Sequence, residues 1–64
     1  MKTIFIESPN LEKDIQNLKH GDIVTLSTNR LGFQAWDELT RLATIVMGIT
    51  GRMPTCYDPS GKVM

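Results

Sequence analysis

The chain has 64 residues, enough for one small domain over residues 1–64 whose folding buries only roughly 60% of the surface of the unfolded chain. Seven basic and seven acidic residues give zero net charge, which argues against a nucleic-acid-binding protein, and no apolar run is long enough to span a membrane. A single cysteine, Cys56, excludes an internal disulfide and suits a reducing compartment, so we expect a cytoplasmic protein.

The first predicted elements are a strand and a helix. Residues 2–6, "KTIFI", are rich in β-branched and aromatic side chains and predict a strand. Ser8 is expected to cap the helix that follows, with Pro9 in its first position. The helix is expected to run to about His20 and to end at Gly21, which tolerates the left-handed conformation of helix ends. Its apolar stripe consists of residues spaced four and three apart, namely Leu11, Ile15 and Leu18.

The second half of the chain predicts another strand, another helix and a hairpin. Residues 22–28, "DIVTLST", are apolar enough for the central strand of a sheet, parallel to the first strand because a helix separates the two. A long helix is predicted over residues 30–50, before Gly51. Residues 52–64 predict a short hairpin around the turn Asp58–Gly61, whose residues stand where a type I turn favours them. The fold class is therefore α/β, with α+β as the alternative: a two-layer domain of order β-α-β-α with a C-terminal β-hairpin.

The helix predicted over residues 30–50 has a wider apolar surface than one small sheet covers. One face carries Leu31, Ala35, Leu39, Leu42, Val46 and Ile49, and a second face beside it carries Phe33, Trp36, Ala43 and Met47. Either the first helix and the hairpin cover the excess, or another subunit does. Because small domains often need a partner subunit for stability, we predict a homodimer or larger oligomer with the second face as its interface. On the polar side, Asp37 and Arg41 have the spacing of a helix ion pair.

The stretch between the second strand and this helix predicts an anion-binding site. Ligands of α/β folds bind beyond the carboxyl ends of parallel strands, and the first turn of a helix offers free N–H groups to an anion. The hydroxyls of Ser27 and Thr28, the amide of Asn29 and the guanidinium of Arg30 complete the predicted site, and Trp36 offers a face for stacking a base. The alternative is that Thr28 or Asn29 only caps the helix and that the aromatic residues are packing. A cation in the first turn opposes the helix dipole, which favours a binding role for Arg30.

Catalytic and metal-binding signatures are weak. Cys56, His20 and Asp58 carry the atoms of a thiol-type catalytic set, but nothing in the sequence brings His20 to Cys56. One histidine and one cysteine fall short of the about four ligands of a structural zinc site. Residues 59–62, "PSGK", lack the first glycine and the final Ser or Thr of a phosphate-binding loop. We therefore expect no enzyme, no metal site and no cofactor.

Two functions remain from the sequence. The first is a non-enzymatic, oligomeric binding protein that holds an anionic, nucleotide-like small molecule at Ser27–Arg30, near a subunit interface. The alternative is a protein-interaction module, such as a phage-type inhibitor or adaptor, that docks on a larger host protein through the apolar face of the helix over residues 30–50. A ligand-binding oligomer would bury its aromatic residues, whereas an adaptor would expose them until its partner arrives.

Overall fold

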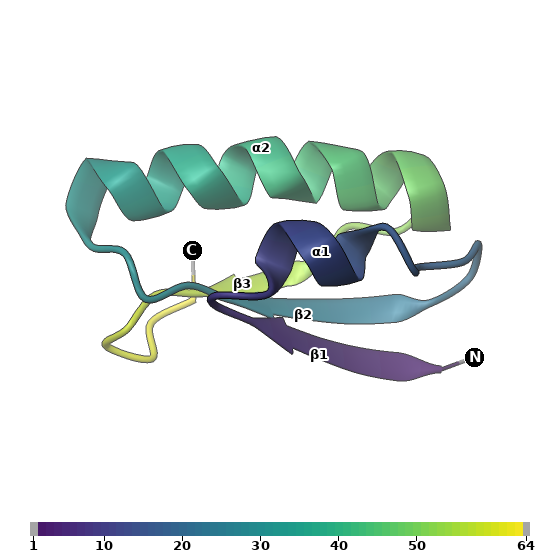
Figure 1. Cartoon of the computed structure of the whole chain (residues 1–64), viewed down its shortest axis with the longest axis horizontal. Helices are drawn as coiled ribbons and strands as arrows, with labels where there is room; N and C mark the ends of the chain where they lie inside the picture. Colours follow the sequence, from purple (N-terminus) through teal and green to yellow (C-terminus); the bar gives the residue numbers. More distant parts are fainter. Residues whose placement is uncertain (1, 64) are drawn as a thin grey trace.

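The computed structural model of the chain describes residues 2–63 and has two helices on one face of a three-stranded sheet (Figure 1). The elements in chain order are β1 (Thr3–Glu7), α1 (Leu11–Ile15), β2 (Ile23–Ser27), α2 (Gly32–Thr50) and β3 (Thr55–Tyr57). The strand order is β1-β2-β3, and both neighbouring pairs are parallel. The predicted α/β class and the central position of β2 are confirmed.

The predicted C-terminal hairpin forms only in part, and its first arm joins the main sheet as β3. β3 pairs in parallel with β2, in a register that sets Cys56 opposite Leu26. The turn over residues 58–61 does form, but the chain beyond it returns only as a single antiparallel bridge between Tyr57 and Val63. Arms this short gain little from pairing with each other, whereas β2 offers β3 the edge of an existing sheet. α2 is therefore a second crossover between parallel strands.

The first helix is shorter than predicted. α1 covers only Leu11–Ile15, and after it the chain forms tight turns in which the Leu18 N–H donates to the Ile15 carbonyl over 3.2 Å. Ser8 does not cap the helix, because its hydroxyl accepts the Asn29 N–H over 3.2 Å instead. These turns are tighter than an α-helical turn, and they bring Leu18 into the core without a further turn of helix. The predicted apolar stripe is buried and so confirmed (Leu11, Ile15 and Leu18).

The long helix begins at Gly32, two residues later than predicted. Leu31, the residue before it, is extended, and no side chain caps the helix, so neither Thr28 nor Asn29 has the predicted capping role. The Thr28 hydroxyl instead accepts the Arg30 N–H over 3.1 Å, which holds the loop between β2 and α2. Arg30 consequently lies before the first helical turn, and its predicted opposition to the helix dipole is wrong.

The C-terminal end of α2 is fixed by backbone bonds to two glycines. Gly51 ends the helix as predicted, with a φ of 77° and an N–H that donates to the Met47 carbonyl over 2.9 Å. Gly21 has a φ of 94° and closes the turn before β2, not the end of α1, and its N–H donates to the Thr50 carbonyl over 3.0 Å. Thr50, which has no predicted role, is buried, and its hydroxyl is satisfied there because it donates to the Val46 carbonyl over 2.9 Å.

The core lies between the sheet and the two helices. From the sheet it takes Ile6, Val24, Leu26 and Cys56, and from α2 it takes Ala35, Leu39, Leu42, Ala43 and Val46. The predicted main face of α2 is thus buried, except that Ile49 is only partly buried and Leu31 is 70% exposed because it precedes the helix. Among residues 2–63, no helix combines the length and the apolar character needed to cross a membrane.

Candidate functional site

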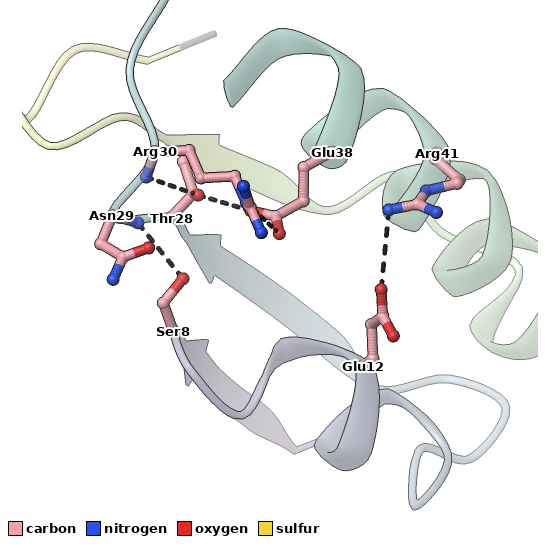
Figure 2. A network of polar contacts seen from close by, with 7 residues as sticks. All are labelled: Ser8, Glu12, Thr28, Asn29, Arg30, Glu38 and Arg41. Carbon is pink, nitrogen blue, oxygen red and sulfur yellow. Dashed lines mark hydrogen bonds and ion pairs between the residues drawn. The ribbon is translucent and has the colours of Figure 1, made fainter. Parts of the chain in front are cut away.

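Polar residues gather where β1 and β2 end, in a cleft beside the start of α2 (Figure 2). This polar cleft has a volume of about 380 Å³ and is lined by Ser8, Pro9, Leu11, Glu12, Asn29, Arg30 and Glu38. It lies beyond the carboxyl ends of parallel strands, the position at which open α/β sheets bind ligands. Asn29 and Arg30, two of the predicted binding residues, line it directly.

A carboxylate on α2 occupies the polar cleft and binds two of the predicted residues. The Thr28 hydroxyl donates to one oxygen of Glu38 over 2.5 Å, and the Arg30 Nε donates to the other oxygen over 3.1 Å (Figure 2). The Thr28 residue is 3% exposed and the Glu38 side chain 14%, whereas the Arg30 side chain is 54% exposed. Glu38 therefore supplies from within the chain the negative charge that the sequence predicts for a ligand, and it offsets the charge of Arg30.

Other predicted contacts fall elsewhere. Ser27 ends β2, and strand alternation directs its side chain to the sheet face opposite Leu26 and the helices, so it does not join the polar cleft. The predicted ion pair between Asp37 and Arg41 is wrong, because Arg41 Nη2 lies 3.6 Å from an oxygen of Glu12 on α1 (Figure 2). Both of these side chains are well exposed, so the pair adds little to stability.

An apolar groove runs along the other flank of α2, between the helix and the segment that enters β3. This α2–β3 groove has a volume of about 360 Å³ and is lined by Trp36, Leu39, Thr40, Ala43, Thr44, Met47, Met53, Pro54 and Cys56. Three of the four predicted interface residues stand at it: Trp36 and Met47 in its walls, and Ala43, only 9% exposed, at its base. Met53 and Pro54 are not among the predicted interface residues, because the sequence predicts a hairpin for their segment.

The large side chains around the α2–β3 groove are exposed. Trp36 is 54% exposed, Met47 47% and Met53 71%. Phe33, the fourth predicted interface residue, is 76% exposed and packs on Trp36, with the ring centroids 5.9 Å apart. The alternative that the aromatic residues of α2 belong to the core is therefore wrong. Trp36 belongs to this groove and does not line the polar cleft.

Each residue of the weak catalytic set has its own contacts within the fold. Cys56 is buried in the core, and burial raises the pKa of its thiol, which disfavours the nucleophilic thiolate. His20 lies against Gly51 at the end of α2, and no hydrogen bond within residues 2–63 joins it to Cys56. The Asp58 carboxylate accepts the Ser60 hydroxyl over 2.6 Å, and this bond leads the contacts that lower the pKa of Asp58.

Within the described part of the chain, no group of three or more His, Cys, Asp or Glu residues is arranged to hold a metal ion. No family model, no curated protein and no solved structure matches the chain.

Proposed function

We propose that this chain is a self-associating, non-enzymatic interaction protein of the cytoplasm that docks a second copy of itself through the α2–β3 groove. The observation that carries the proposal is a cluster of exposed large apolar side chains: Trp36, Met47 and Met53 line the groove, and Phe33 packs on Trp36 beside it. Contiguous apolar surface of several hundred Å² on a small domain marks interaction sites.

The residue types at the groove support docking. Tryptophan is enriched among the residues that dominate binding energy, and methionine adapts its shape to a partner because it is unbranched and flexible. Thr40 and Thr44 line the groove beside Trp36 and Met47, so a docked surface meets hydroxyls as well as apolar side chains. Cys56, the single cysteine, is buried at the groove and agrees with a reducing compartment.

Self-association is tested with two matched substitutions on α2. Met47 and Ile45 are both about half exposed, at 47% and 45%, but Ile45 lies on the flank toward α1, away from the groove. We expect the wild type to sediment as a dimer at micromolar concentration and Met47→Asp to sediment as a monomer, because an unpaired charge in an apolar interface costs several kcal/mol. Ile45→Asp should remain dimeric. A monomeric wild type across the micromolar range, or equal effects of the two substitutions, contradicts the proposal.

Anion binding in the polar cleft is the second candidate, favoured by the position of the cleft beyond the strand ends and by the exposed guanidinium of Arg30. A bound phosphate or nucleotide would compete with the Glu38 carboxylate for this guanidinium. We therefore expect Glu38→Gln to strengthen anion binding and Arg30→Ala to abolish it.

The measurement for this second candidate is thermal melting with a panel of nucleotides and cyclic dinucleotides, because a ligand that binds only the folded state raises the melting midpoint. Arg52→Ala is the matched control, since it removes an exposed cation beyond the far end of α2 that does not line the polar cleft. If no anion raises the midpoint of either the wild type or Glu38→Gln, the cleft is a structural ion pair and not a binding site.

A further inference from the structure

We infer that the two copies pair through antiparallel α2 helices. The two-fold axis that relates the copies lies level with the midpoint between residues 41 and 42 of each helix. This inference rests on the proposed self-association and adds the geometry of the interface. In this geometry, the α2–β3 groove of each copy receives the exposed α2 side chains that line the groove of the other copy.

The order of side-chain sizes along α2 carries the inference. Of the α2 residues that line the groove, Leu39 is buried and Thr44 is a further small residue. The groove side otherwise presents Trp36, Thr40, Ala43 and Met47, with large residues outside and small residues inside. Their spacings of four, three and four are symmetric about the point between residues 41 and 42. An antiparallel second copy therefore sets Trp36 opposite Met47 and Thr40 opposite Ala43.

Helix packing explains why this order suits a pair of crossing helices. Two packed helices cross at an angle, so their axes are closest at one point and diverge on both sides of it. Small residues at the crossing, here Thr40 and Ala43, allow the close approach. Large residues on either side, here Trp36 and Met47, fill the space that opens as the helices diverge. A parallel pair would also set the small residues at the crossing, but it would align the two helix dipoles and set the rigid Trp36 rings opposite each other. The antiparallel pair opposes the dipoles and sets each Trp36 ring against the flexible Met47 side chain.

The exposed apolar side chains supply more than half of the surface that each partner buries in a standard interface. At about 200 Å² for a whole large side chain, the exposed fractions of Phe33, Trp36, Met47 and Met53 amount to on the order of 500 Å². A standard interface buries about 800 Å² from each partner, and the exposed threonines and the segment over residues 52–54 extend the surface toward that value. Zero net charge means that two identical copies have little mutual repulsion to overcome.

Cross-linking between two exposed positions of α2 tests the direction of the pairing. Asp37 and Gly48 lie outside the groove lining, and an added side chain at Gly48 meets nothing within 4 Å. At 1.5 Å per residue, the antiparallel arrangement sets residue 37 of one copy about 3 Å along the axis from residue 48 of the other, but about 14 Å from its own counterpart. A parallel arrangement brings residue 37 level with residue 37.

We expect the double variant Asp37→Cys/Gly48→Cys to shift to a covalent dimer when treated with a short bismaleimide. Either single variant should remain at the monomer position on a denaturing gel. The wild type controls for Cys56, which is buried, and Ile45→Cys controls for random collisions. Equal cross-linking of the single variant Asp37→Cys overturns the antiparallel geometry, as does a double variant that sediments as a dimer but does not cross-link. A wild type that is monomeric in solution instead overturns the self-association on which the inference rests.

Discussion

Thr28 has the most consequential polar side chain in the described chain. Its hydroxyl is almost fully buried, donates to Glu38 and accepts the Arg30 N–H, and it thereby joins the loop after β2 to the second turn of α2. Thr28 belongs to the stretch that the sequence marks as special, but its partner is a carboxylate ten residues along the chain. Residues ten positions apart have no regular spacing that would mark them as partners in the sequence. The sequence therefore singles out Thr28 but does not predict its bond to Glu38.

Replacing this hydroxyl should cost stability. Thr28→Val keeps the shape of the side chain but leaves the Glu38 oxygen and the Arg30 N–H without this partner, so we expect a loss of about 1–3 kcal/mol in the free energy of unfolding. Thr28→Ser keeps the hydroxyl and should lose less. Urea denaturation at one fixed protein concentration measures both values, because the proposed self-association would also contribute to apparent stability. Equal losses for the two variants would show that the methyl group matters and the hydrogen bonds do not.

At the scale of elements, α2 determines the layout of the molecule. Its length carries the chain back along the sheet, so that β3 enters parallel to β2 and the chain forms two crossovers in succession (Figure 1). The 3.6-residue period predicts this helix and its buried face, because both depend on neighbours within a few residues. The direction of β3 depends on a partner strand about thirty residues away, and the local turn signal over residues 58–61 suggests a hairpin instead.

The two glycines near the end of α2 should respond in opposite ways to alanine. Gly51 has a φ of 77° and lies against the His20 ring, so Gly51→Ala should destabilise the protein by roughly 1–2 kcal/mol. Gly48 is exposed inside the helix with open space around its Cα, so Gly48→Ala should stabilise it by about 0.5–1 kcal/mol. Paired denaturation curves measure both changes. A destabilising Gly48→Ala would indicate that a partner packs closely on this part of α2.

At the scale of the whole molecule, the sequence predicts the exposed apolar residues of α2 better than it predicts the contacts in the polar cleft. The surplus of apolar residues on α2 is visible from its composition, and Phe33, Trp36 and Met47 are indeed exposed. The predicted anion site is harder to judge from sequence, because the ion pair between Arg30 and Glu38 links a loop to a helix across eight residues. Met53 and Pro54 form the other wall of the α2–β3 groove. They can be recognised as such only once the position of β3 in the sheet is known.

The single bridge between Tyr57 and Val63 has a consequence for colloidal behaviour. Unpaired edge strands are templates on which further chains add, and this addition begins aggregates. The bridge lays the end of the described chain along the outer side of β3, so that this edge of the sheet is shielded next to the α2–β3 groove. The edge of the sheet without such a bridge is β1, at the far side, so any strand addition is expected there and away from the proposed docking surface.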